Sequence, residues 1–134
     1  MTKDVLVIGT GISGLAYAIH VAEENCNISI VLISKSNINE GNTRYAQGGI
    51  AVVSNFKKDS FKKHIDDTII AGAGTCDPEV VKFVIEEGHQ RVNELIEWGA
   101  QFDKKRKQLD LAKEAGHSEK RIVHYKDQTG QHIQ

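Results

Sequence analysis

Residues 4–14 read Asp4-Val5-Leu6-Val7-Ile8-Gly9-Thr10-Gly11-Ile12-Ser13-Gly14, an apolar run followed by three spaced glycines. The apolar run predicts a buried β-strand over 4–8, and the residues after it predict a helix over 12–24. Glycines placed between a strand and a helix are typical of a dinucleotide cradle, where N–H groups of the helix N-terminus face a pyrophosphate. An ordinary strand-to-helix turn is the alternative interpretation.

The three glycines have separate predicted roles. Gly9 permits the tight turn, Gly11 leaves space for a pyrophosphate beside the backbone, and Gly14 lets the helix pack closely on the strand. A second apolar run predicts a strand over 28–33, so that residues 4–33 form a βαβ unit with a parallel pair. The predicted fold class is α/β, a partial Rossmann-like domain with a helical insertion.

Composition excludes several classes of function. The chain has 134 residues, enough for about one domain, and a formal net charge of −1, which does not favour nucleic acid or an anionic membrane as partner. No apolar stretch approaches the ~20 residues of a membrane span. Because a strand is predicted to begin at residue 4, we expect no signal peptide. Cys26 and Cys76 lie far apart, which favours reduced thiols in the cytoplasm, and the histidines show no metal-ligand spacing.

Residues 34–49 predict a polar, glycine-rich loop that binds something, because structureless stretches of this length are uncommon inside a domain. Ser34-Lys35 stands where an acidic residue usually holds a ribose hydroxyl; it could contact sugar and phosphate, or be a solvated loop start. The Thr43 hydroxyl, the Gln47 amide and the N–H groups of Gly48 and Gly49 suit a flat ring system such as a flavin. A flexible surface loop is the alternative.

The second half of the chain predicts helices and a polar loop. We expect a helix over 59–71 and a longer one that begins with Asp77 as N-cap and Pro78 at its first position, and ends at Gly99. The basic run 104–107 is expected to be a solvated loop. Residues 127–130 resemble a helix start, and the presence of two strands alone suggests the front part of a longer protein.

Residues 114–118, Glu114-Ala115-Gly116-His117-Ser118, gather several chemical groups in a short space. The Glu114 carboxylate could hold a substrate ammonium, and His117 could donate a hydrogen bond to a carboxylate or move protons near neutral pH. An exposed polar turn is the alternative.

Four motifs together resemble one known family: Glu40-Gly41-Asn42-Thr43-Arg44-Tyr45-Ala46-Gln47-Gly48-Gly49-Ile50-Ala51, Asp67-Thr68-Ile69-Ile70-Ala71-Gly72-Ala73-Gly74, Gly116-His117-Ser118 and Arg121-Ile122-Val123-His124. The first looks like the flavin loop of the succinate dehydrogenase/fumarate reductase flavoprotein superfamily. Within that superfamily the sequence is most similar to the L-aspartate oxidases, from about residue 4 to residue 134. The resemblance implies an FAD-binding domain, of which this chain is the N-terminal part, with the catalytic arginine and the carboxylate-binding histidines outside these residues.

The resemblance also assigns regions and residues. It implies a βαβ unit over 4–33, a flavin loop over 34–49, a helical region over 59–99 and a substrate-side loop over 104–126. Asn42 stands where covalent flavoproteins of the superfamily have histidine, which implies non-covalent FAD. Glu114 and His117 replace the phenylalanine and glutamine of the dicarboxylate enzymes, which implies that Glu114 orients a substrate ammonium. The FAD contacts implied are Gly9, Thr10, Gly11, Ile12, Ser13, Gly14, Ser34, Lys35, Asn42, Thr43, Arg44, Tyr45, Ala46, Gln47, Gly48 and Gly49.

The activity implied is oxidation of L-aspartate to iminoaspartate, with electrons passed to oxygen, giving hydrogen peroxide, or to fumarate. This would be the first step of NAD biosynthesis through quinolinate, with functional coupling to quinolinate synthase. Two alternatives stay open: a fumarate reductase or succinate dehydrogenase flavoprotein subunit, and a non-catalytic nucleotide-binding fragment.

Overall fold

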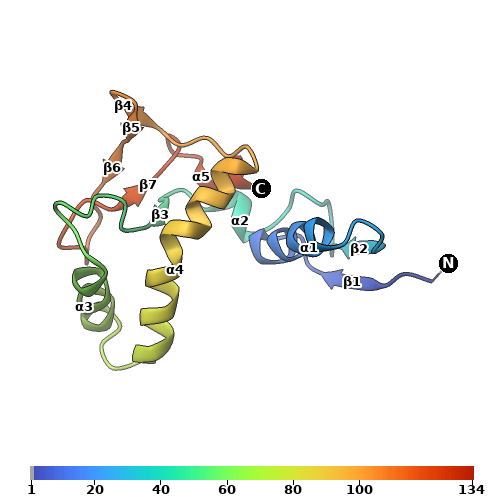
Figure 1. The fold of residues 1–134 in the computed structure, drawn as a ribbon, viewed down its shortest axis with the longest axis horizontal. Helices are drawn as coiled ribbons and strands as arrows, with labels where there is room; N and C mark the ends of the chain where they lie inside the picture. Colours follow the sequence, from blue (N-terminus) through green and yellow to red (C-terminus); the bar gives the residue numbers. More distant parts are fainter. Residues whose placement is uncertain (1) are drawn as a thin grey trace.

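The computed structural model describes residues 2–134, and Figure 1 shows the arrangement of its helices and strands. The elements in chain order are β1 (Val5–Ile8), α1 (Ile12–Glu24), β2 (Ile30–Ile33), α2 (Asn42–Tyr45), β3 (Ile50–Ala51), α3 (Phe61–Ala71), α4 (Pro78–Glu97), β4 (Lys104–Lys105), β5 (Gln108–Leu109), β6 (Leu111–Ala112), β7 (Ile122–Val123) and α5 (Thr129–Ile133).

The βαβ unit predicted at the start of the chain is confirmed. β1 and β2 pair in parallel with Val5 opposite Ile30, and α1 connects them over the predicted bounds. β1 begins one residue later and β2 two residues later than expected. At this end Asp4 and Ser29 are joined by backbone and side-chain hydrogen bonds, and the Ser29 hydroxyl donates to Asp4 at 2.6 Å. The α/β fold class therefore holds.

The expectation of a fully buried first strand is wrong for this part of the chain. Val7 is buried, whereas Leu6 is 58% and Ile8 80% exposed. Successive strand residues point to opposite faces of a sheet. Within residues 2–134, α1 covers the face of the sheet on which Val7 lies, and no element covers the opposite face, on which Leu6 and Ile8 lie.

The segment 34–49 is not a continuous loop, because residues 42–45 form the short helix α2. The helix start predicted near 127–130 is confirmed as α5, which packs directly against α2. Gly130 makes this close approach possible: its N–H donates to the Ala46 carbonyl at 2.8 Å, and a β-carbon on Gly130 would overlap the Thr43 carbonyl oxygen. In Figure 1, α2 lies between the βαβ unit and the small sheet of β3, β7 and β6.

The loop predicted over 104–126 contains strands. β4 and β5 form a hairpin, and β6 pairs with β7, which also pairs with β3, all antiparallel. The hairpin turns at Arg106 and Lys107, whose φ angles are 50° and 69°. A two-residue turn of this type needs positive φ at both positions and usually carries Asn or Gly. The usual sequence signal for a hairpin is therefore missing here.

α3 and α4 form an antiparallel pair that projects away from the small sheet (Figure 1). α3 begins two residues later than predicted: Ser60 is the N-cap and accepts from the Lys63 N–H at 3.2 Å, while Asp59 lies outside the helix. The predicted start of α4 is confirmed, since Asp77 accepts from the N–H of Glu79 at 2.9 Å. Gly99, with φ of 107°, follows its end.

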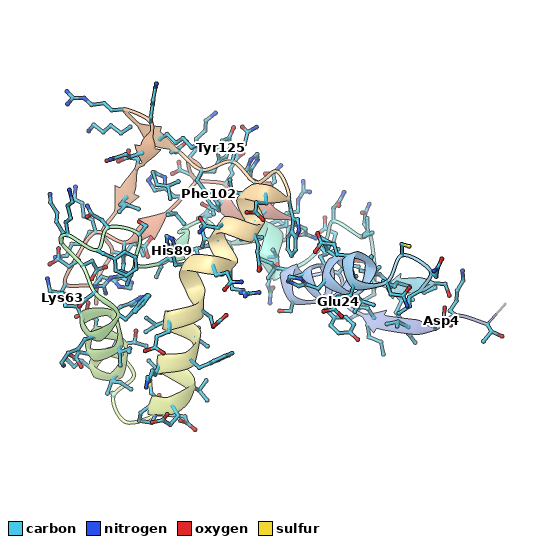
Figure 2. All side chains as sticks on the ribbon, in the orientation of Figure 1. Asp4, Glu24, Lys63, His89, Phe102 and Tyr125 are labelled. Atoms are coloured by element: carbon cyan, nitrogen blue, oxygen red, sulfur yellow. The ribbon has the colours of Figure 1, made fainter. Side chains whose placement is uncertain are left out.

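The main core joins α4 to the small sheet. Its buried members are Val52, Val92, Phe102 and Val123. Phe102 lies between the C-terminal half of α4 and the sheet, as Figure 2 shows. This packing fixes β7, and with it the segments that lead into and out of β7, against the rest of the chain.

In residues 2–134, none of the helices has the length and apolar character needed to cross a membrane.

Candidate functional site

The glycine turn joins the end of β1 to the start of α1. Gly9 has a φ of 107°, which glycine adopts without the cost that a β-carbon adds, and its N–H donates to the Ile33 carbonyl at 2.9 Å. A β-carbon on Gly14 would overlap the Gly9 carbonyl oxygen and lie 3.2 Å from Val7 Cγ1. The turn and the close helix–strand packing predicted for Gly9 and Gly14 are both present.

The first turn of α1 is partly occupied by the chain itself. The Ile12 N–H donates to the Thr43 hydroxyl oxygen at 3.1 Å, so it is not one of the free N–H groups expected there. A β-carbon on Gly11 would stand 3.2 Å from the same oxygen. The N–H groups of Ser13 and Gly14 have no acceptor within residues 2–134, and they belong to the helix turn that can serve an anion.

Ser34 and Lys35 follow the carboxyl end of β2, beside the glycine turn, and both are exposed. Thr10 is buried and donates from its hydroxyl to the Ile38 carbonyl at 2.9 Å. Gln134, at the end of α5, donates to the carbonyls of Thr10 and Ile38 at 3.3 and 3.2 Å. The turn after β1 and the loop after β2 are thus held together from the other end of the chain.

The remaining residues of the predicted flavin loop, Asn42 to Gly49, run from α2 to β3. Asn42, Gln47 and Gly48 are exposed, Arg44 is half-buried, and the Tyr45 hydroxyl donates to Glu40 at 2.7 Å. This hydrogen bond, together with the Glu40 charge, raises the pKa of Tyr45. A groove of about 510 Å³ lies along the loop, lined by Gln47, Gly48, Ala112, His124, Lys126 and Asp127.

The end of this loop meets the other predicted site, residues 114–118. A β-carbon on Gly48 would lie 3.0 Å from Oε1 of Glu114. Gly49 has a φ of 134°, and a β-carbon there would lie 2.5 Å from the Val123 carbonyl oxygen. Glycine at both positions therefore lets the loop approach β7 and Glu114 closely. The structure brings together two segments that the sequence could only describe separately.

Glu114 and His117 belong to one turn, since the His117 N–H donates to the Glu114 carbonyl at 3.3 Å. Glu114 is exposed, and no cation of residues 2–134 lies within ion-pair distance of its carboxylate. His117 is half-buried and points its Nδ1 toward the Arg121 guanidinium, 3.2 Å from Nη1. The Glu114 carboxylate is thus available for a ligand cation.

A buried ion network, which sequence reasoning missed, holds this turn. Arg121 is fully buried just before β7, and its Nε and Nη2 donate to the two oxygens of Asp59 at 2.9 and 2.8 Å. Its Nη1 donates to Asp67 of α3, and Asp67 also accepts from the N–H and hydroxyl of Ser118, both at 2.8 Å. Asp67, Ser118 and Arg121 all stand in motifs that carry the family resemblance, but the sequence does not show that they bind one another or Asp59.

The network shifts several pKa values. Burial by itself would raise the pKa of Asp67, but hydrogen bonds from the Ser118 N–H and Arg121 outweigh burial and lower this pKa to about 2. Burial would also raise the pKa of Asp59, but hydrogen bonds from Arg121 and from the Ser60 N–H outweigh burial and lower this pKa. His64 of α3 is 5% exposed and packs with its ring centroid 5.6 Å from that of His117. Burial, with Arg121 next in importance, lowers the pKa of His64 to about 4.

The polar groups of the glycine turn, the loop after β2 and the groove beside Glu114 fit an extended nucleotide that carries a flat ring. A helix turn with two N–H groups that no acceptor of the described residues binds lies at one end, and polar residues follow β2. A groove lined in part by Gly48, next to the Glu114 carboxylate, lies at the other end. In the same residues 2–134, no three side chains of His, Cys, Asp or Glu converge as metal ligands.

Comparison with known proteins gives matches along nearly the whole chain. A family model described as FAD binding domain matches residues 4–134. L-aspartate oxidase from rice (Oryza sativa subsp. japonica), described as chloroplastic, is 47% identical over 132 residues, covering 98% of this chain and 20% of the relative. L-aspartate oxidase from Yersinia pestis is 43% identical, covering 98% of this chain and 25% of the relative.

Among solved structures, a mutated quinol fumarate reductase from E. coli superposes with a TM-score of 0.91 at 30% identity, covering 99% of this chain and 23% of that chain. This chain therefore spans between a fifth and a quarter of the length of these similar proteins.

Proposed function

Since the chain belongs to the family of FAD binding domains, as its match to the family model over residues 4–134 shows, we propose that the protein carrying it oxidises L-aspartate to iminoaspartate with non-covalently bound FAD. The observation that carries the proposal is the contact between Glu114 and Gly48, which puts beside the predicted flavin loop a carboxylate that no cation of residues 2–134 pairs with. Identities of 47% and 43% to L-aspartate oxidases support the choice of substrate.

The glycine turn and the loops after β2 and α2 are the proposed FAD contacts. The N–H groups of Ser13 and Gly14 would bind the pyrophosphate, and Ser34 and Lys35 would contact sugar and phosphate. Residues 42–49 would hold the isoalloxazine edge. Asn42 offers an amide where covalent attachment needs a nucleophilic side chain, which is why the flavin is proposed to be non-covalent.

FAD, when bound, would supply the redox chemistry by accepting the hydride from the substrate α-carbon and passing the electrons to oxygen or fumarate. The chain's own residues would orient the substrate. The Glu114 carboxylate would bind the substrate ammonium, and His117, on the same turn, would lie near a substrate carboxylate. The anionic Glu114 side chain would distinguish L-aspartate from succinate, because succinate has no ammonium that could pair with the carboxylate.

The reaction would be the first step of NAD biosynthesis through quinolinate, and we propose functional coupling to quinolinate synthase because the imine product is unstable in water. A cytoplasmic location agrees with two free thiols, Cys26 and Cys76.

Two other functions have some support. A fumarate reductase or succinate dehydrogenase flavoprotein would agree with the TM-score of 0.91 to the E. coli enzyme, but Glu114 would then face a substrate without an ammonium. A non-catalytic nucleotide-binding role for these residues alone would agree with their limited share of the relatives' length.

The test is to purify the full-length protein and assay it with both diacids. We expect a yellow protein that releases intact FAD on denaturation and forms hydrogen peroxide with L-aspartate but not with succinate. A colourless protein would contradict FAD binding. Oxidation of succinate, with none of aspartate, would favour the dicarboxylate enzymes instead.

A further inference from the structure

Arg121 uses all of its hydrogen-bonding capacity inside the protein. A guanidinium has five N–H donors and no acceptor. Its Nε and Nη2 serve Asp59, Nη1 serves Asp67 and faces His117, and Nη2 also reaches the Ser118 hydroxyl at 3.5 Å. Burial by itself would lower the pKa of Arg121, but the hydrogen bonds and charges of Asp59 and Asp67 outweigh burial and raise this pKa above its usual value, so the group stays a cation.

This donor-only neighbour determines which nitrogen of His117 carries the proton. Nη1 of Arg121 lies 3.2 Å from Nδ1 of His117 and can only donate to it. A proton on Nδ1 would point at a guanidinium N–H, so the ring is held with Nδ1 as acceptor and its proton on Nε2. Nε2 has no acceptor in residues 2–134. It is also not fully buried there, unlike His64 Nδ1, which is buried without a partner. It therefore lies at the surface of this part of the chain as a hydrogen-bond donor.

The same arginine fixes the position of the turn. Ser118 binds Asp67 through both its N–H and its hydroxyl, and Asp67 is held in turn by Arg121. The Arg121 carbonyl accepts from the Val52 N–H at 2.8 Å, which ties it to the strand that follows Gly48 and Gly49. Arg121 thus connects α3, the turn of Glu114 and His117, and the end of the predicted flavin loop.

We infer that Arg121 is a positioning residue for the substrate: it holds His117 as an Nε2–H donor to a carboxylate oxygen of the diacid, on the turn that also carries Glu114. The inference rests on the proposed function. It gives the two ends of that turn complementary roles, an acceptor for the substrate ammonium and a neutral donor for a carboxylate. It also assigns His117 to binding and not to proton abstraction.

Substitutions at His117 test the donor directly in the full-length holoenzyme. The amide nitrogen of glutamine can replace Nε2, whereas asparagine reaches only to the position of Nδ1. We expect His117→Gln to keep the KM for L-aspartate within about threefold of wild type, and His117→Asn to raise it about tenfold, the loss of one hydrogen bond at about 1.4 kcal/mol per factor of ten. Equal effects of the two variants would overturn the inference.

Arg121→Lys tests the positioning role. The lysine ammonium keeps the positive charge but cannot donate to Asp59, Asp67 and His117 at the same time in the geometry of the planar guanidinium. We expect KM to rise about tenfold with kcat within about twofold. In a His117→Asn background, Arg121→Lys should add less than about twofold, since it acts through His117. Effects that multiply, or an unchanged KM in the single variant, would contradict this role. Arg91→Lys, an exposed arginine paired with Glu87 and Glu94, is the matched control.

Two arrangements keep the outcome decisive. If Arg121→Lys does not fold, the His117 pair still decides whether the Nε2 donor exists, and equal effects of the two variants overturn the inference, because Arg121 acts through that donor. If wild type binds FAD but does not oxidise aspartate, the proposed function fails, and the same variants are compared by the Kd for succinate, read from the flavin absorbance. The inference then stands if His117→Asn weakens succinate binding and His117→Gln does not, and falls otherwise. A colourless protein that binds neither diacid overturns both.

Discussion

The carboxylate of Glu114 lies against the backbone of Gly48, so closely that a β-carbon on Gly48 would stand 3.0 Å from Oε1. The two residues come from segments that are far apart in the sequence, the loop after α2 and the turn after β6. Their contact joins the predicted flavin loop to the predicted substrate carboxylate. We therefore expect the Glu114 charge to affect the binding of L-aspartate.

Glu114→Gln removes the charge and keeps the shape. We expect the KM for L-aspartate to rise roughly 10–100-fold, because a hydrogen bond to a charged group contributes about 1.5–3 kcal/mol. Fumarate reduction by the same protein, measured with a reduced dye, should change little, since fumarate has no ammonium. Glu86→Gln, on the exposed side of α4, is the control. Equal losses with aspartate and fumarate would mean that Glu114 supports the fold only.

Gly14→Ala should disrupt the glycine turn, because the added β-carbon overlaps the Gly9 carbonyl oxygen. We expect a loss of about 1–3 kcal/mol in unfolding free energy and a lower FAD content, read from the absorbance ratio of the purified protein. Gly88→Ala is the matched change within α4, where the new β-carbon would lie 3.8 Å from Val52 Cγ2, an ordinary contact. That variant should gain about 0.5–1 kcal/mol. A Gly14→Ala protein with full FAD content would argue against a cradle.

Asp59→Asn should be strongly destabilising. Asp59 is 5% exposed and accepts both arms of the buried Arg121 fork, so the variant leaves a buried cation short of a counter-charge. We expect the unfolding free energy in urea to fall by about 3 kcal/mol or more. Asp66→Asn, which breaks an exposed pair with Lys62, should cost less than about 1 kcal/mol. Similar costs for the two variants would show that the network contributes no more than a surface pair.

His64 should make the protein less stable as the pH falls. Its pKa is about 4 in the folded chain and near 6.5 when exposed. Between these values the unfolded chain binds a proton that the folded chain does not, so stability decreases as the pH drops through this window. The loss reaches about 3 kcal/mol by pH 4, from a shift worth about 1.4 kcal/mol per unit.

Comparing wild type with His64→Gln in urea at several pH values between 7 and 4.5 isolates this effect. The variant should lose less stability over the window. Asp67, whose pKa is lowered to about 2, adds stability that is lost only at more acidic pH. Parallel pH profiles for the two proteins would be inconsistent with a buried neutral His64.

Local signals predicted several elements well. α1 has the predicted bounds, α4 begins at Asp77 and Pro78, and Gly9 adopts the positive φ that a tight turn needs. Each signal depends on neighbours in sequence: helical periodicity, an N-cap, or backbone freedom. The hairpin at Arg106 and Lys107 could not be predicted, because its turn residues are not those that favour positive φ.

The sequence by itself determined the β1–α1–β2 unit, the glycine turn and the residue types available for binding, since these follow from interactions over a few residues. Only the tertiary structure decided that Glu114 lies against Gly48, that Arg121 binds Asp59 and Asp67, and that α5 packs on α2 through Gly130. Such pairs depend on the closing of long loops and on one core that fixes many segments together. No local pattern specifies them, because each partner's position depends on the packing of the whole chain.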